Sequence, residues 1–239
     1  MTDGRLSSKA IPPNERLIVP LDVPDHDEAL RLVDLLGDGV TFYKVGLELF
    51  LAGDYRALVG TLRDRGKEVF LDLKLFDVPN TVAAAVRQVD DSGARFVTVH
   101  GNDAILEAAC SAAQHIGVLG VTVLTSLDAA DLEDLGFATS VEKLVVSRAR
   151  RALRLGCAGV VSSGLEVPSI RDEVGEKLAI VVPGVRPVAN DDDQKRVVTP
   201  EDAFLAGADH IVVGRPIREA PDPRAAAARI QESIAELFG

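Results

Sequence analysis

Short apolar runs alternate with longer amphipathic stretches along most of the chain. The apolar runs predict β-strands over residues 17–22, 41–45, 68–73, 96–100, 120–124, 159–162, 179–182 and 210–213. Several runs, such as Leu17-Ile18-Val19 and Ile211-Val212-Val213, are apolar throughout. Continuous apolar strands are typical of parallel sheets that are buried on both faces. The pattern therefore predicts a parallel sheet.

The stretches between these strands carry apolar residues at helical spacing. They predict helices over residues 27–36, 55–65, 81–92, 103–114, 141–155 and 224–237. Asn80 is a suitable N-cap for the third of them, and glycines at positions 37, 66, 93 and 156 are suitable helix stops.

The number of these units predicts the architecture. Eight strand–helix units in 239 residues leave about 30 residues for each, the size of a βα repeat. No linker divides them, so we expect one (β/α)8 barrel over residues 16–239, preceded by a flexible N-terminal extension over residues 1–15. An open doubly wound sheet is the alternative, but this sequence has no GxGxxG motif after its first predicted strand to support it.

Composition and charge narrow the function classes. Hydrophobic residues make up 47% of the chain and charged residues 26%, as in ordinary globular proteins. The net charge of −11 argues against nucleic acid or an anionic membrane as a partner. Cys110 and Cys157 belong to no CxxC motif or Cys/His cluster, and no apolar run approaches the ~20 residues of a membrane span. We therefore expect a cytoplasmic protein without a structural zinc site.

Polar residues gather where the predicted strands end. In a (β/α)8 barrel, functional side chains come from the carboxyl ends of the strands and from the loops that follow. The residues at these places are Asp22, Lys44, Asp72, Lys74, Asp77, His100, Thr125, Ser126, Arg186, Gly214 and Arg215. Their repeated occurrence predicts a functional site at this end of the barrel.

The densest group of charges lies in the third predicted strand. Alternation along a strand directs Asp72 and Lys74 to one side and the intervening leucines to the other. A structural ion pair would explain Asp72 and Lys74 alone, but Lys44 and Asp77 add two further charges nearby. Such an alternating array is nearly neutral and would keep Lys74 protonated, as a proton donor must be.

The last two loops suggest an anion site. Loops after strands seven and eight commonly bind phosphate in this architecture, and Arg186 and the pair Gly214-Arg215 occupy them. An arginine in such a place can also be a solvated surface residue. The long loop over residues 183–199 is either solvated or a lid over the ligand. No HExxH spacing indicates a metal site.

Ten consecutive residues carry a family resemblance. The segment Asp72-Leu73-Lys74-Leu75-Phe76-Asp77-Val78-Pro79-Asn80-Thr81 resembles the signature of bacterial orotidine 5′-phosphate decarboxylases. Shorter matches follow in family order over about residues 17–217: Leu21-Asp22, Tyr43-Lys44-Val45-Gly46, Val99-His100-Gly101, Leu124-Thr125-Ser126, Pro183-Gly184-Val185-Arg186-Pro187 and Val213-Gly214-Arg215.

The resemblance implies decarboxylation of orotidine 5′-phosphate to uridine 5′-phosphate, the last step of pyrimidine synthesis, without cofactor or metal. It implies that Lys74 donates the proton to C6 of the pyrimidine and that Asp72 lies against the substrate carboxylate. Lys44 would pair with Asp72 and the ribose hydroxyls, and Asp22 would also bind ribose.

The same resemblance implies a homodimer with shared active sites, in which Asp77 and Thr81 reach into the site of the partner subunit. Thr125 and Ser126 would contact the pyrimidine. The phosphate would be held, and the lid closed, by Arg186, Gln194, Gly214 and Arg215. Gln194 is assigned only by its position before Lys195-Arg196-Val197-Val198-Thr199-Pro200.

Two alternatives remain open. Related magnesium-dependent barrels that act on sugar phosphates, such as keto-gulonate phosphate decarboxylases and hexulose phosphate synthases, share the Asp-x-Lys-x-x-Asp motif. They place a glutamate where Lys44 stands here, so Lys44 argues against them. A non-catalytic nucleotide-binding barrel would be expected to lose Lys74 or an aspartate, and all four charged residues are present.

Overall fold

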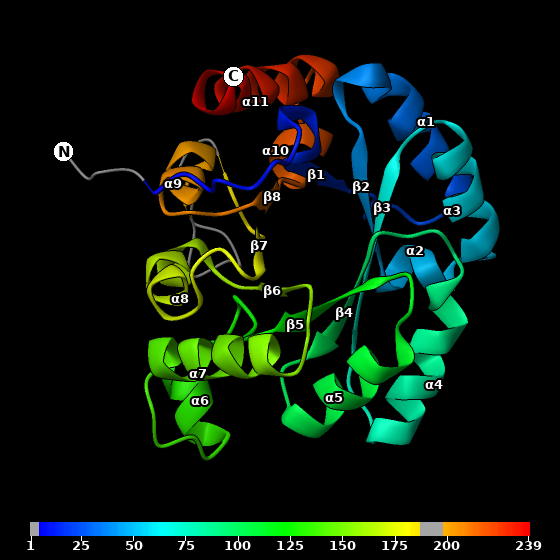
Figure 1. Cartoon of the computed structure of the whole chain (residues 1–239). Helices are drawn as coiled ribbons and strands as arrows, with labels where there is room; N and C mark the ends of the chain where they lie inside the picture. The colour runs from blue at the N-terminus through cyan, green and yellow to red at the C-terminus, as the bar shows by residue number, and fades with distance from the viewer. Residues whose placement is uncertain (1–4, 187–197) are drawn as a thin grey trace.

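Eight parallel strands close into a barrel, with helices around its outside (Figure 1). The structure is a computed structural model that describes residues 5–186 and 198–239. Hydrogen-bonded neighbours follow chain order, and β8 pairs with β1 to close the barrel. The strands are β1 Leu17–Pro20, β2 Phe42–Gly46, β3 Glu68–Leu75, β4 Phe96–His100, β5 Gly117–Val121, β6 Gly159–Val161, β7 Ala179–Val182 and β8 His210–Val212. The predicted (β/α)8 barrel is confirmed.

Helices connect successive strands across the outer surface (Figure 1). They are α1 His26–Leu36, α2 Leu47–Leu51, α3 Tyr55–Asp64, α4 Pro79–Asp90, α5 Asp103–Ala112, α6 Ala129–Asp134, α7 Val141–Arg154, α8 Val167–Val174, α9 Pro200–Leu205, α10 Arg215–Arg218 and α11 Pro223–Phe238. Short 3₁₀ turns lie at Pro13–Glu15, Gly37–Gly39 and Gly164–Glu166. Within the described residues, none of the helices has the length and apolar character needed to span a bilayer.

Two separate sets of apolar side chains fill the fold. One set packs between the outer faces of the strands and the surrounding helices. The other fills the barrel interior and contains Phe42, Phe70 and Phe96, whose rings contact one another. Because these rings block the middle of the barrel, ligands can enter only from an end.

Strand β5 begins and ends three residues earlier than the predicted strand over 120–124. Gly117 pairs with Phe96, and a Cβ on Gly117 would lie 2.8 Å from the Phe96 ring. A glycine is therefore required where the large neighbouring ring enters the barrel. The low β-propensity of glycine hid this start from the sequence pattern.

Helix α4 begins at Pro79, two residues before the predicted start, and Val78 rather than Asn80 occupies its N-cap position. Proline suits the first helical turn because its fixed φ is helical and its missing N–H would have no partner there. The glycines predicted as helix stops all have positive φ, from 60° at Gly37 to 81° at Gly156.

Residues 5–15, for which the sequence predicts a flexible extension, contact the amino-terminal end of the barrel. Ser7 is buried and donates a hydrogen bond to Asp209, which immediately precedes β8. The Lys9 ammonium lies 2.7 Å from the same carboxylate and 2.6 Å from the Leu178 carbonyl oxygen. These contacts tie the segment to the two last strands.

Candidate active site

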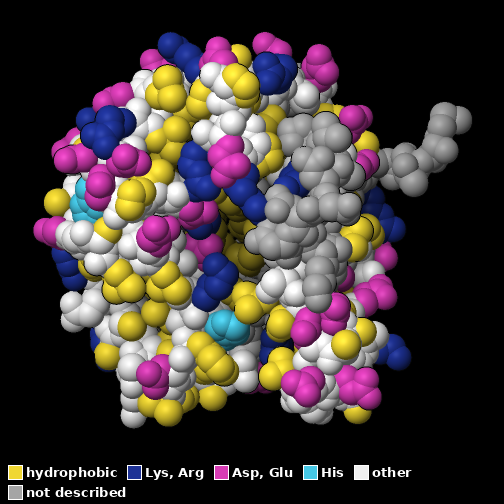
Figure 2. Space-filling model, turned by 180° about the vertical axis from the view of Figure 1, so that it is seen from behind, with side chains coloured by type: hydrophobic (Ala, Val, Ile, Leu, Met, Phe, Trp, Pro, Cys, Tyr) yellow, Lys and Arg dark blue, Asp and Glu magenta, His cyan; other side chains and the backbone are white. Residues whose placement is uncertain are grey.

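A cavity of about 480 Å³ opens at the carboxyl ends of the strands. Figure 2 shows a hollow in the middle of one face, with charged side chains at its edge and hydrophobic side chains deeper inside. The predicted site residues that line the cavity are Asp22, Lys44, Asp72, Lys74, Thr125, Ser126, Arg186, Gly214 and Arg215. The structure therefore brings together residues from six different strand–loop connections.

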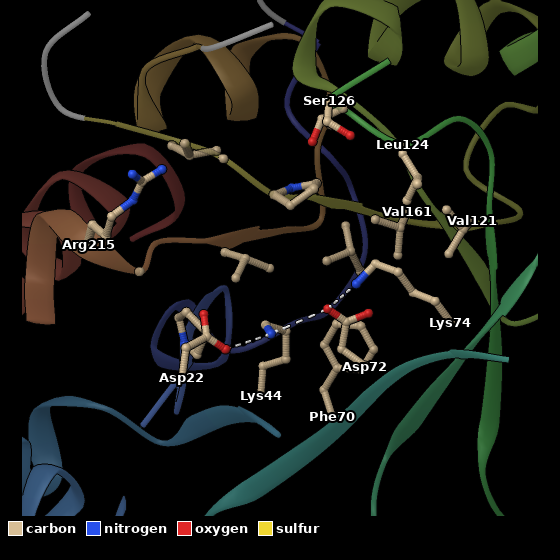
Figure 3. Close-up of a pocket in the computed structure, with 18 of the residues that line it drawn as sticks. Asp22, Lys44, Phe70, Asp72, Lys74, Val121, Leu124, Ser126, Val161 and Arg215 are labelled. Carbon is tan, nitrogen blue, oxygen red and sulfur yellow. Dashed lines mark hydrogen bonds and ion pairs between the residues drawn. The ribbon is translucent and has the colours of Figure 1, made fainter. Parts of the chain in front are cut away.

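Four charged side chains form a row along one wall of this cavity (Figure 3). The Lys44 ammonium, on β2, lies 3.2 Å from Asp22 Oδ1 and 3.4 Å from Asp72 Oδ2. The Lys74 ammonium, near the end of β3, lies 2.8 Å from the same Asp72 oxygen. Signs alternate along the row, so each charge has an opposite neighbour.

The pKa of Asp72 lies below its ordinary value. Burial alone would raise it, but the positive charges of Lys44 and Lys74 and hydrogen bonds from Lys74 and Thr98 outweigh burial. Asp72 is therefore ionised at neutral pH.

The backbone at Lys74 has an unusual conformation. Its φ is +46°, the only positive φ of a non-glycine residue in the described ranges 5–186 and 198–239. The pairing between β3 and β4 shifts register between Leu71 and Leu75, around this residue. Such a conformation costs energy and persists only where surrounding contacts impose it.

A buried threonine supplies two of these contacts. Thr98 on β4 is fully buried; its hydroxyl accepts a 2.9 Å hydrogen bond from the Lys74 amide and donates a 3.0 Å bond to Asp72 Oδ1. Sequence reasoning missed Thr98. Its signal was its alternation with Phe96 and His100, which places it on the inward face of the strand beside β3.

Arginine side chains also line this cavity. Arg215, at the start of α10, lies across the pocket from Lys74 (Figure 3). Arg186 and Arg218 also line the cavity, and Arg218 was not predicted. A Cβ on Gly214 would lie 3.0 Å from a Pro20 ring carbon, so this close approach of backbone favours glycine.

The floor between these charged sides is apolar, and the sequence analysis did not predict it. Phe70, Val121, Leu124 and Val161 line it, in part from the same set of side chains that fills the barrel interior (Figure 3). An apolar floor excludes water and strengthens the electrostatic interactions beside it.

Two predicted site residues do not line this cavity, and the placement of a third is not described. Asp77 and Thr81 are exposed on the β3–α4 connection and the first turn of α4, and they do not line the cavity of their own chain. The Asp77 carboxylate accepts a 2.6 Å hydrogen bond from the Val78 amide. Gln194 lies outside the described residues.

These features define a class: a (β/α)8 barrel whose pocket combines a row of alternating lysines and aspartates with a distant arginine side. Such a pocket suits an extended ligand with an anionic group at the arginine side. The sequence profile of the orotidine 5′-phosphate decarboxylase / HUMPS family matches residues 15–230, and the chain belongs to this family.

Several relatives are similar over nearly their whole length. The orotidine 5′-phosphate decarboxylase of Methylococcus capsulatus is 60% identical over 98% of this chain and 97% of its own. That of Rhodopseudomonas palustris is 49% identical over 93% of this chain and 95% of its own. The crystal structure of the Lactobacillus acidophilus enzyme of the same name superposes with a TM-score of 0.82 at 31% identity, covering 92% of this chain and 99% of that one.

Proposed function

We propose that this protein decarboxylates orotidine 5′-phosphate to uridine 5′-phosphate and carbon dioxide, in pyrimidine biosynthesis. The observation that carries the proposal is the Lys44–Asp72–Lys74 row inside the cavity of a chain 60% identical to a protein of that name. The activity of the relatives is extended to this chain because the row is intact.

The polar residues of the cavity suggest how the substrate binds. The arginine side would hold the phosphate through Arg215 and Arg186, together with the Gly214 backbone and Gln194. Asp22 and Lys44 would bind the ribose hydroxyls, and Thr125 and Ser126 would contact the pyrimidine. This orientation directs C6 of the pyrimidine towards Asp72 and Lys74.

In the reaction, the bond between C6 and the carboxylate breaks, and its electron pair stays on C6. The Lys74 ammonium stabilises the developing negative charge and then donates its proton to C6. Asp72 lies beside the substrate carboxylate and repels it, and this repulsion ends as neutral carbon dioxide leaves. The site thus favours the transition state over the bound substrate, with binding at the phosphate offsetting the repulsion.

We propose that the reaction uses no metal or cofactor, because the lysine ammonium groups supply the positive charge that a metal would supply elsewhere. Lys44 bears on this point. Its ammonium lies between Asp22 and Asp72 and occupies the place between two carboxylates where a divalent cation would be held. The magnesium-dependent sugar-phosphate barrels are therefore the less suitable assignment.

We also propose that the active unit is a homodimer with shared sites. Asp77 is followed by exposed Val78 and preceded by exposed Phe76, 63% and 65% accessible in the single chain. Apolar side chains next to a charged residue suit a subunit contact that carries Asp77 and Thr81 into the partner's cavity.

Subunit mixing tests this sharing. Asp77→Asn and Lys74→Ala dimers, each inactive, should form mixed dimers in which one site is intact, restoring about a quarter of wild-type activity at equal ratio. Absence of recovery, with exchange demonstrated by mass-labelled subunits, would contradict a shared site.

The activity itself is tested by the fall in ultraviolet absorbance of orotidine 5′-phosphate with purified protein, with and without a chelator. Turnover unaffected by chelation is expected. Activity lost on chelation and restored by magnesium would favour the sugar-phosphate relatives. Nucleotide binding without turnover would indicate a non-catalytic barrel.

A further inference from the structure

The only two cysteines of the chain lie against each other, and neither lines the active-site cavity. Cys110 on α5 and Cys157, in the turn between α7 and β6, have their sulfur atoms 3.4 Å apart although 47 positions separate them. Cys157 is buried, 7% accessible, whereas Cys110 is partly buried. Neither residue has a role in the proposed reaction.

The local fold fixes this approach. Helix α7 ends in a turn at Gly156, whose φ is +81°, and the Cys157 amide donates a 2.9 Å hydrogen bond to the Ala152 carbonyl. On the other side, Cys110 on α5 packs against the same apolar core that contains the fully buried Ala109. Cys110 is therefore held on a helix, and Cys157 in a short turn whose backbone is fixed by the Ala152 hydrogen bond.

We propose that Cys110 and Cys157 are a redox modification site that closes to an intramolecular disulfide when the protein meets a peroxide. A disulfide needs its sulfur atoms about 2.0 Å apart. Side-chain rotation on each residue can close the remaining distance from 3.4 Å.

The chemistry balances with hydrogen peroxide as the two-electron oxidant. The Cys110 thiolate attacks one peroxide oxygen; the O–O bond breaks, and hydroxide leaves and is protonated to water. Cys110 is then a sulfenic acid. The Cys157 sulfur attacks it, the S–O bond breaks, and the Cys157 proton leaves with the hydroxyl group as a second water. Two thiols and one peroxide give one disulfide and two waters.

Exposure and hydrogen bonding assign the two roles. The contact with Cys157 lowers the pKa of Cys110, whereas the same contact and burial raise the pKa of Cys157. The more accessible sulfur is thus also the better nucleophile, and the buried thiol is the one that resolves the sulfenic acid.

The cross-link would close a loop that contains β5, α6 and α7, together with the cavity residues Thr125 and Ser126. A closed loop restricts the unfolded chain, so the oxidised protein should be more resistant to heat. We expect its Tm to rise by roughly 5–10 °C and to return when dithiothreitol reduces the bond.

The experiment treats reduced full-length protein with hydrogen peroxide and counts free thiols with a maleimide mass tag. Both thiols should disappear while the mass falls by two hydrogen atoms, and peptide mapping should find Cys110 joined to Cys157 within one chain. The assay does not use turnover, so its result is independent of the proposed decarboxylase activity.

Single variants separate the roles of the two thiols. In Cys157→Ala, Cys110 should stop at the sulfenic acid, which dimedone traps; in Cys110→Ala, Cys157 should stay reduced, and neither variant should gain Tm on oxidation. If Cys157→Ala does not fold, Cys110→Ala decides alone. Thiols that persist after treatment, a cross-link between chains, or a sulfenic acid in the wild type without a disulfide would each overturn the proposal.

Discussion

Two clusters of charged side chains lie at opposite ends of the same barrel, each built around a buried aspartate. At the amino-terminal end, Asp209 is fully buried and accepts hydrogen bonds from Arg171 and Lys9, both at 2.7 Å, and from the Ile180 amide at 2.8 Å. The cations also donate to backbone carbonyls: Arg171 reaches Gly207 at 2.8 Å. The Asp209 carboxylate and the Arg171 guanidinium are enclosed by protein partners, and Lys9 is only partly exposed.

At the carboxyl-terminal end, Asp72 likewise receives two cations and a hydroxyl. The difference lies in Lys74, whose side chain is 36% accessible and lines the cavity, on a backbone with positive φ. Ion pairing alone therefore does not separate a structural cluster from a functional one. An accessible ammonium on a strained backbone does, because its free side can face a ligand.

Removing the accessible cation should have the largest effect on activity and little effect on stability. Lys74→Ala takes away the proposed proton donor while Lys44 still neutralises Asp72. We expect kcat to fall at least about 10⁴-fold, with the Tm within a few degrees of wild type and binding of uridine 5′-phosphate still measurable. Steady-state kinetics and calorimetry measure both.

The matched control is Lys177→Ala, which removes an exposed lysine away from the cavity and should change neither quantity. A Lys74→Ala enzyme with wild-type kcat would rule out the proposed proton donor.

Breaking the enclosed cluster should do the reverse. Asp209→Asn leaves Arg171 and Lys9 only the more distant Glu176 carboxylate, at 3.8 and 3.9 Å, and loss of one partner of a buried ion pair is strongly destabilising. The free energy of unfolding should fall by about 3–5 kcal/mol, while kcat of the folded fraction stays unchanged. Urea denaturation and kinetics at low temperature measure these effects.

If Asp209→Asn does not fold, Lys9→Met provides a milder test, because Lys9 is partly exposed and Arg171 remains. A loss of kcat larger than the loss of folded protein would show that the two ends of the barrel are coupled, and would contradict the separation of a structural end from a functional end.

A smaller effect is expected from Thr98, which supports Lys74 without lining the cavity. Thr98→Val keeps the shape of the side chain but removes both hydrogen bonds, so Asp72 and the strained Lys74 backbone lose a support. We expect kcat to fall roughly 10- to 100-fold with little change in KM, because positioning rather than binding is lost.

Thr98→Ser restores the hydroxyl and should recover most of the rate. A merely structural role for Thr98 predicts loss of Tm in Thr98→Val without a change in kcat, and that result would reject it as a positioning residue.

The barrel and much of the cavity could be predicted from the sequence because both depend on short-range periodicity. Alternation places Asp72 and Lys74 on one side of β3, and the rule that strand ends meet places Arg215 in the same cavity. Contacts between residues far apart in the sequence could not be predicted. Thr98 bonds to Lys74 across a register shift between β3 and β4. Lys9 is polar and predicts a flexible segment, because the sequence does not show that Asp209, 200 positions later, binds it.

The smallest expected difference between the two ends of the barrel lies in the pH dependence of stability. His210, in the enclosed end, is buried; its Nδ1 lies 2.9 Å from the Glu15 carbonyl oxygen. Burial, with the charges of Arg95 and Arg16, lowers the pKa of His210 to about 4. Because the folded pKa lies below the unfolded value of about 6.5, the unfolded chain gains a proton first as pH falls.

The contribution of His210 to stability is therefore complete above about pH 6.5 and is lost as pH falls towards 4, by roughly 2 kcal/mol at pH 5 relative to pH 7. His210→Asn, whose amide can keep a hydrogen bond to Glu15, should show a loss between pH 7 and pH 5 that is smaller by that amount in urea denaturation. Its kcat profile over the same range should match the wild type, since the cavity contains no part of this end. Suppose that the wild type and His210→Asn lose the same unfolding free energy between pH 7 and pH 5. His210 would then have the same pKa in the folded and unfolded chain, and its buried position would not keep it neutral.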